Sequence, residues 1–240
     1  MRILELWRYP VKSLQGEQVD SVSVTADGLE GDRRFAIYDL QTGLGLTARR
    51  RPELLFASAR LRDDGLAEIT LPDGSVAGDD AGLSAWLGQA VALRSMDADV
   101  PREYENPLDF EHEPTSAWER FTGPPGAFHD SKSTRVSLVS TATIGSWDRR
   151  RFRSNVLVDG EGEDALVGSR LGLGGAVIEV GERIQRCVMT TRPQPGGIER
   201  DLQVLRIIAR ERDACLGIGA LVAEAGVVSV GDAVTREDRP

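Results

Sequence analysis

Short stretches of alternating apolar and polar residues, together with short apolar runs, recur along the chain and predict β-strands. The alternation is clean over residues 18–25 and partial over residues 2–9, and the mainly apolar runs at residues 35–38, 176–180 and 217–222 also indicate strands. Glycine, proline and aspartate residues lie between many of these stretches, as expected of turns. We therefore expect a chain built mainly of short strands.

Few segments show the spacing of a helix. The most convincing one begins at Asp79 or Asp80, whose carboxylate can cap the first helical turn. Its apolar face would consist of Leu83, Trp86 and Leu87. Shorter helical segments are expected after Thr141 and over residues 201–208. The expected fold class is mostly β with a few helices (β/α+β).

The chain divides into two expected halves. Many short strands and one helix up to about residue 98 predict a small barrel or curled sheet. Residues 99–130 are rich in proline and acidic residues and poor in aliphatic ones, so we expect a linker or long loop, although such a loop can also be a functional lid. The predicted domains are a barrel-like domain over residues 1–98 and a second domain over residues 99–240.

Composition narrows the class of protein. The chain has 240 residues, of which 40 % are hydrophobic and 28 % charged, as is ordinary for a soluble globular protein. A formal net charge of −9 argues against non-specific nucleic-acid binding, which depends on neutralising phosphates. No apolar run suits a signal peptide or a membrane span, so no membrane association is expected. Two cysteines far apart in sequence make no disulfide framework, and the cytoplasm is the expected location.

Cys187 is the main candidate for chemistry. Arg183, Arg186 and Arg192 lie within a few residues of it, and fixed positive charge favours the thiolate, which is both a nucleophile and a soft metal ligand. A Pro/Gly-rich loop follows over residues 192–197. The alternative is a small buried cysteine that fills a gap in the core. That alternative is our interpretation of Cys215.

Hydroxyl and basic side chains occur together at several expected strand ends, where they could converge on an anion. They include Lys12 and Ser13, Ser133 and Thr134, the arginine run 149–153 with Asn155, and the pair Arg33 and Arg34. Successive side chains of a strand face opposite ways, so only one of Arg33 and Arg34 can face a given pocket. The two histidines have no zinc-ligand spacing, and the glycines of residues 168–175 form no dinucleotide-binding fingerprint.

Five short motifs, in order along the chain, resemble the MOSC family, the molybdenum-cofactor sulfurase C-terminal domain preceded by its N-terminal β-barrel domain. They are Tyr9-Pro10-Val11-Lys12-Ser13, Gly31-Asp32-Arg33-Arg34-Phe35, Thr47-Ala48-Arg49, Arg151-Phe152-Arg153-Ser154-Asn155 and Arg186-Cys187-Val188-Met189-Thr190-Thr191. Ser154 stands where the family pattern has proline. The branch that the chain is most similar to is the mitochondrial amidoxime-reducing component and its bacterial relatives.

The resemblance implies a cofactor and a site. Cys187 would be the catalytic metal ligand, coordinating the molybdenum of a molybdopterin cofactor held between the two domains. The cofactor-binding positions would be Lys12, Ser13 and Arg34 from the first half and Ser133, Thr134, Arg153, Asn155 and Arg186 from the second.

Three functions are open at this stage. The first is a molybdenum-dependent oxidoreductase that reduces small N-oxygenated (N-hydroxylated) compounds with electrons from a separate reductase. The second is a carrier of the molybdenum cofactor or its sulfur, with Cys187 as a persulfide and no turnover of its own. The third and weakest is a pyridoxal phosphate site with Lys12 as the Schiff-base lysine.

Overall fold

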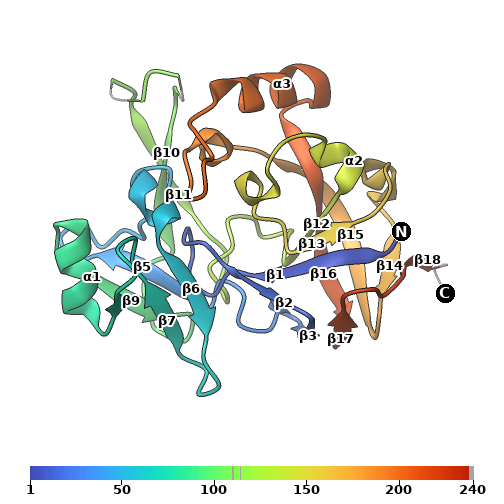
Figure 1. Cartoon of the computed structure of the whole chain (residues 1–240), viewed down its shortest axis with the longest axis horizontal. Helices are drawn as coiled ribbons and strands as arrows, with labels where there is room; N and C mark the ends of the chain where they lie inside the picture. Colours follow the sequence, from blue (N-terminus) through green and yellow to red (C-terminus); the bar gives the residue numbers. More distant parts are fainter. Residues whose placement is uncertain (110, 114, 238–240) are drawn as a thin grey trace.

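Strands make up most of the regular structure of the protein, and the fold class is as expected (Figure 1). The computed structural model describes residues 1–109, 111–113 and 115–237. Within this part, no helix is long and apolar enough to cross a membrane.

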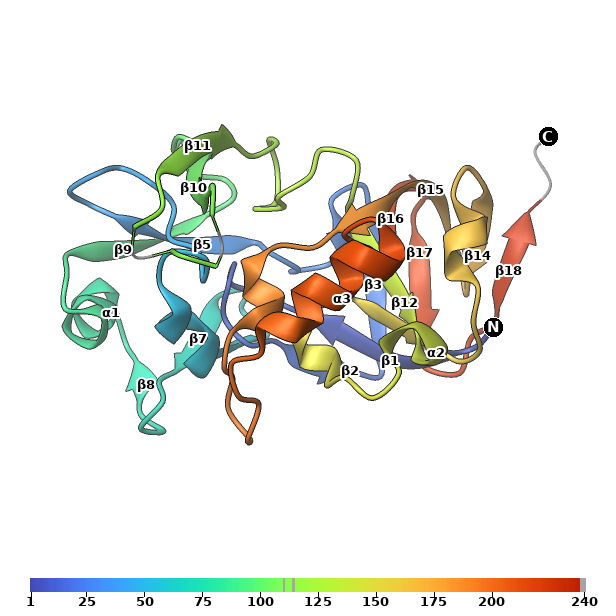
Figure 2. The same cartoon turned by 90° about the horizontal axis from the view of Figure 1, so that it is seen from above.

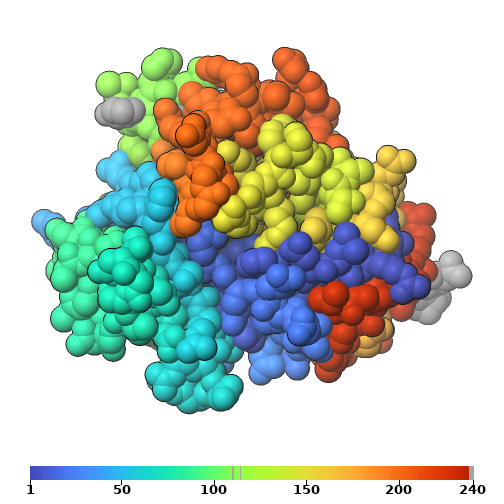
Figure 3. All heavy atoms as spheres, in the orientation of Figure 1, coloured from blue at the N-terminus to red at the C-terminus, as the bar shows by residue number. Residues whose placement is uncertain are grey.

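The main sheet joins the beginning of the chain to its second half. Its strand order is β18-β14-β15-β16-β12-β13-β1-β2. The bounds are β1 (Ile3–Arg8), β2 (Glu17–Val19), β12 (Val136–Ser140), β13 (Val156–Val158), β14 (Arg170–Leu173), β15 (Ala176–Gln185), β16 (Cys215–Glu224) and β18 (Val234–Glu237). In a smaller sheet, β3 (Ser21–Thr25) pairs with both β17 (Gly226–Ser229) and β4 (Gly28–Leu29). In Figure 3 the dark blue start of the chain accordingly lies against yellow and red segments of the second half.

The other lobe is formed by residues 30–98. It contains the pair β5 (Phe35–Asp39) and β9 (Val91–Ser95), and the sheet β6 (Ser58–Leu61), β7 (Ala67–Thr70) and β8 (Val76–Ala77). A 3-10 turn at Pro52–Phe56 and helix α1 (Asp80–Leu87) complete it. The first thirty residues are joined to strands of the second half, because β1 pairs with β13 and β3 pairs with β17.

Each lobe has its own buried apolar cluster. One cluster includes Ile3 and Leu6 of β1 together with Leu138, Ile178 and Ile218 of the main sheet. The other lies under β5 and α1 and includes Ile37, Leu54 and Leu83. Because the two clusters are separate, the region between the lobes is free to carry polar groups.

The three expected helices are present. Asp79 caps α1 by accepting from the Gly82 amide at 2.9 Å, and Gly88, with φ of 65°, ends it. Asp201 caps α3 (Leu202–Arg212), which buries Val204, Leu205 and Ile208. Helix α2 (Thr141–Ile144) is a single turn.

Residues 99–130 are not the structureless linker that composition suggests. They contain an antiparallel hairpin, β10 (Glu103–Pro107) and β11 (Trp118–Thr122), on the β5 side of the molecule (Figures 1 and 2). Its Tyr104 is fully buried, and Gly45 and Gly123 leave room for the ring because a Cβ at either would lie within 3 Å of it. Pro114, one of the prolines behind the linker prediction, lies outside the described residues.

Candidate functional site

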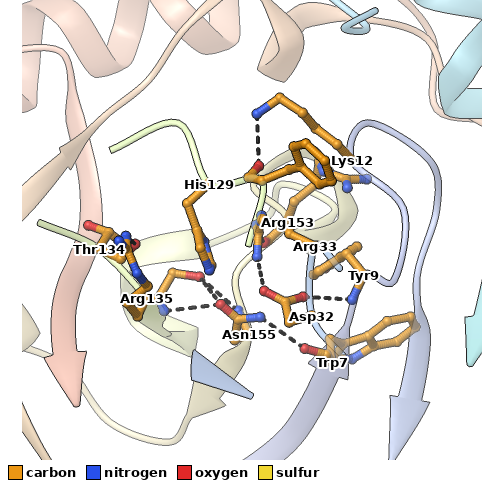
Figure 4. Close-up of polar contacts among 12 residues, drawn as sticks. Trp7, Tyr9, Lys12, Asp32, Arg33, His129, Thr134, Arg135, Arg153 and Asn155 are labelled. Atoms are coloured by element: carbon orange, nitrogen blue, oxygen red, sulfur yellow. Dashed lines mark hydrogen bonds and ion pairs between the residues drawn. The ribbon is translucent and has the colours of Figure 1, made fainter. Parts of the chain in front are cut away.

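A cavity of about 640 Å³ lies where the two lobes meet. Side chains from both halves line it, and Figure 4 shows several of the polar ones. The polar and charged residues that line it include Lys12, Ser13, Arg33, Arg49, His129, Asp130, Ser131, Thr134, Arg153, Asn155, Glu182, Arg183, Arg186, Cys187, Asp213 and Cys215.

Most of the residues assigned to the site from the sequence line this one cavity. Lys12 and Ser13 reach it from the turn after β1, and Thr134 from the segment before β12. The others that line it are Arg153, Asn155, Arg186 and Cys187. Two assigned residues, Arg34 and Ser133, do not line it.

The sequence assignment expected Arg34 at the cavity, but the structure does not place it there; its neighbour Arg33 lines the cavity instead. Arg34 is partly exposed and faces Asp97, with 3.5 Å between Nη2 and Oδ2. Arg33 lines the cavity, pairs with Asp32 and lies close to Arg153 (Figure 4). Strand β5 begins only at Phe35, and Arg33 adopts a left-handed backbone with φ of 51°, so strand alternation does not decide which arginine points inward.

Ser133 lies at a separate surface pocket with Arg170 and Glu179. Its neighbour Thr134 turns the other way and donates its hydroxyl to Glu182 at 2.7 Å, a carboxylate that also accepts from Ser131. The two hydroxyls that line the cavity here are therefore those of Ser131 and Thr134.

Asp130 connects two buried cations of the cavity. Its carboxylate pairs with Lys12 and, at 2.7 Å, with Arg49 Nη2, and Lys12 Nζ also donates to the Phe128 oxygen at 2.9 Å. Burial lowers the pKa of Lys12 to about 8, against the attraction of Asp130. Burial alone would raise the pKa of Asp130, but Arg49 and Lys12 together hold it well below its usual range. Asp130 was missed because it lies in the segment interpreted as a linker.

Arg153 is buried and Arg186 is partly buried, and neither has a carboxylate partner among the described residues. Arg153 lies over the Tyr9 ring at 4.3 Å and donates to the Leu14 oxygen. Arg186 donates to the main-chain oxygens of Phe152 and Leu216, each at 2.8 Å. Burial lowers the pKa of each guanidinium to about 10. Both side chains would gain from an anion in the cavity.

Asn155 has a structural function in addition to lining the cavity. Its Oδ1 accepts from the amide and hydroxyl of Ser137 at 3.1 and 2.8 Å, and its Nδ2 donates to the Trp7 oxygen at 3.2 Å (Figure 4). These contacts join β12 and β1 to the start of β13, which is one physical reason for an asparagine at this position.

Cys187 lies at the edge of the cavity, partly exposed, just before a 3-10 turn over Val188–Thr191. Its carbonyl accepts from the amide and hydroxyl of Thr190 at 3.1 and 3.0 Å. Burial alone would lower the pKa of Arg49, but Asp130 and the Cys187 sulfur raise it. Arg49 Nε and Nη1 are buried and have no hydrogen-bond partner in the part of the chain that the structure describes.

Of the three arginines close to Cys187 in sequence, Arg183 and Arg186 line the cavity and Arg192 does not. Arg183 pairs with Asp164 and Asp213, each at 3.3 Å. Arg192 pairs with Glu113. Arg49, which belongs to the Thr47-Ala48-Arg49 motif, also lines the cavity.

Cys215 is not the core residue that its apolar neighbours suggest. It is partly exposed, begins β16 opposite Gln185 of β15, and lines the same cavity as Cys187. The two free thiols of the chain therefore share one cavity.

Strained backbone occurs at this cavity. Four residues other than glycine that line it have positive φ, a conformation that costs free energy for residues with a Cβ: Ser13, Arg33, Arg153 and Asp213. Such positions persist where the surrounding structure holds them, as at ligand-binding sites.

Two protein-family models match the sequence of this chain. Residues 1–98 match the MOSC N-terminal beta barrel domain and residues 125–235 match the MOSC domain. The chain is 27 % identical over 247 aligned residues to a molybdenum cofactor sulfurase of Drosophila grimshawi, covering 92 % of this chain and 32 % of that protein. It is 34 % identical over 80 residues to mitochondrial amidoxime reducing component 2 of Bos taurus, covering 29 % of this chain and 24 % of that protein. The chain thus spans a third or less of the length of these curated relatives.

Among solved structures, the YUAD protein from Bacillus subtilis aligns over 97 % of this chain and 93 % of its own at 14 % identity, with a TM-score of 0.46. YiiM from Geobacillus stearothermophilus aligns over 58 % of this chain and 74 % of its own at 16 % identity, with a TM-score of 0.38. The two sequence matches to residues 1–98 and 125–235 take up most of the chain, and the protein belongs to the MOSC domain family.

Proposed function

We propose that the protein binds a molybdenum cofactor through Cys187 and reduces small N-oxygenated compounds with electrons from a separate reductase. The observation that carries this proposal is the cavity itself, in which a partly exposed thiol lies among buried cations. Thiolate is a ligand type suited to soft and borderline metals, and arginine is suited to phosphate.

The charge balance of the cavity fits an anionic group. Lys12, Arg33, Arg49, Arg153 and Arg186 line it, and burying cations without counter-charge is costly. Asp130 and Asp32 neutralise part of that charge, but within the described residues Arg153 and Arg186 contact only main-chain acceptors and aromatic rings. Arg49 has two buried N–H groups for which the described residues supply no partner, so its donors are also incompletely used. These residues fit the phosphate of a pterin cofactor.

Each residue then has a definite task. Cys187 would hold the metal, while Lys12, Ser13, Arg33, Arg153 and Arg186 would hold the phosphate and orient the pterin. Bound there, the cofactor would supply a two-electron removal of oxygen from the substrate. The chain itself would fix the position of the sulfur through the Thr190 contacts and would keep a cationic, partly enclosed cavity around it.

The comparisons support the molybdenum-cofactor part more strongly than the reaction. Both curated relatives are named for molybdenum cofactor chemistry or amidoxime reduction, and the match to the amidoxime reducing component is confined to 29 % of this chain. The sulfurase match over 92 % of the chain favours a second candidate, a carrier of the cofactor or of its sulfur with Cys187 as a persulfide.

Metal analysis separates the two candidates. Protein produced in a host that makes the cofactor should contain about one molybdenum per chain and should lose it in Cys187→Ala, whereas Cys215→Ala is the matched control because its thiol lines the same cavity. Loaded protein should also reduce an amidoxime when supplied with an artificial reductant. Protein that contains no molybdenum but carries a cyanide-labile sulfur on Cys187 would support the carrier instead.

A further inference from the structure

Arg192 is buried beside the cavity but does not line it. It forms an ion pair with Glu113 in which the two side chains are only 8 % and 11 % exposed. Its Nη2 also donates to the main-chain oxygen of Arg49 at 2.6 Å. Arg192 therefore joins Glu113, the turn that follows Cys187, and the segment that contains Arg49.

The turn after Cys187 depends on such an anchor. It is a single 3-10 turn, Val188–Thr191, and a turn of this kind has little stability of its own. Cys187 begins the turn by accepting from Thr190, and Arg192 ends it by donating its amide to the Met189 oxygen at 3.2 Å. A fixed Arg192 side chain therefore fixes the far end of the turn whose near end is Cys187.

The same ion pair is connected to Arg49, which lines the cavity together with Cys187. The main-chain oxygen of Arg49 accepts from Arg192, and the Cys187 sulfur raises the pKa of the Arg49 guanidinium. That guanidinium pairs with Asp130 at 2.7 Å and lies over the Phe121 ring of β11 at 5.2 Å. Arg49 is thus contacted by a ring of β11, and Arg192 by the carboxylate of Glu113, which lies between β10 and β11.

We propose that Glu113 and Arg192 are positioning residues that hold the Cys187 thiol in place against Arg49. This deepens the proposed function, because it concerns the residue assigned to the metal. It does not depend on molybdenum, since the contacts are made by the chain alone. No substrate contact is assigned to either residue.

The test measures thiol accessibility in the purified 240-residue chain without added molybdenum. Wild type, Glu113→Gln and the control Glu111→Gln are labelled with iodoacetamide, and the rates at Cys187 and Cys215 are read separately by peptide mass spectrometry. Glu111 is a matched control because it lies in the same segment and pairs with Arg206 at 2.8 Å, but that pair is 35 % and 45 % exposed. Cys215 is an internal control because it lines the same cavity from another strand.

Glu113→Gln should raise the labelling rate of Cys187 by about tenfold or more and leave that of Cys215 within about twofold, because breaking a buried ion pair shifts local opening strongly. Glu111→Gln should change neither rate. Equal increases at both cysteines would show that the ion pair only stabilises the fold, and an unchanged labelling rate of Cys187 would overturn the proposal.

If Glu113→Gln does not fold, Arg192→Lys is tested in its place, and the same selective increase in the labelling rate of Cys187 is required. Molybdenum content plays no part in the readout, so failure of the metal assignment would leave this test intact.

Discussion

Arg33 and Arg34 are neighbours in sequence, yet only Arg33 faces the cavity, while Arg34 faces Asp97 at the surface. The cause is local, because Arg33 has a left-handed backbone just before β5 begins. Substitutions of Arg33 and Arg34 therefore form a matched comparison, because the two side chains point in different directions but share nearly the same sequence context.

Arg33→Gln should weaken retention of the molybdenum cofactor by about tenfold to a hundredfold, because a charge-assisted contact to phosphate contributes about 1.5–3 kcal/mol. Arg34→Gln should change retention by less than about twofold. The measurement is molybdenum remaining after dialysis of loaded protein, with the melting temperature of each cofactor-free variant recorded beside it. Equal losses in the two variants would contradict the placement of Arg33 at the phosphate.

Lys12→Met should stabilise the cofactor-free protein and abolish tight retention of the cofactor. The pKa of Lys12 falls from 10.5 to about 8 through burial, so its charged form is less favourable in the folded than in the unfolded chain. At about 1.36 kcal/mol per pKa unit, burial of the charged Lys12 lowers the free energy of unfolding of the wild type by about 3 kcal/mol below pH 8. This effect disappears as the pH rises to 10.5. Urea unfolding of both proteins between pH 7 and 10.5 tests this, and the difference in unfolding free energy should shrink across that range. A wild type that is more stable than the variant at pH 7 would show that the ion pair with Asp130 outweighs burial.

Acid should destabilise the protein through His129. Burial lowers the pKa of His129 from 6.5 to about 3, so the unfolded chain binds a proton more readily than the folded one within that window. Stability should therefore decrease as the pH falls from 6.5 towards 3, by up to about 5 kcal/mol from this group alone.

His129→Gln should flatten this part of the stability profile while keeping a donor for the Asp27 oxygen, which lies 3.1 Å from Nε2. His112→Gln is the control, since His112 is largely exposed and pairs only with the exposed Asp109. Unfolding free energies at steps of pH give the comparison. Identical slopes for wild type and His129→Gln would mean that His129 is not the group responsible.

The isolated protein should not oxidise NADH or NADPH by itself. Reduction of an N-hydroxylated compound consumes two electrons per turnover, and the sequence contains no iron–sulfur, dinucleotide or haem attachment motif. Turnover should therefore require reduced viologen or a partner reductase, whose transient docking surface should be small and partly polar. The assay follows product formation and NADH absorbance together, and steady NADH oxidation by the isolated chain would defeat the proposal.

Local pattern was enough to predict the fold class and the helices. Period-two alternation depends on burial of one face of a strand, and the capping aspartates at residues 79 and 201 depend only on neighbouring amides, so both are local in sequence. The hairpin over residues 103–122 escaped prediction because its strands are polar and acidic. Tyr104 of β10 is buried in a cluster with Ala36, Tyr38 and Phe128, and these contacts between distant residues are not visible in the composition.

The candidate site shows the same division. Residue types and motif order led to Lys12, Arg153, Arg186 and Cys187, which line one cavity in the structure. Which further residues reach that cavity was decided by tertiary structure. A left-handed backbone favours Arg33 over Arg34, Cys215 reaches the cavity from the start of β16, and Arg49 and Asp130, far apart in the chain, pair with each other there. These outcomes depend on the direction of each side chain and on contacts between segments far apart in the sequence. Both are set only when the whole chain has folded, so local sequence patterns do not reveal them.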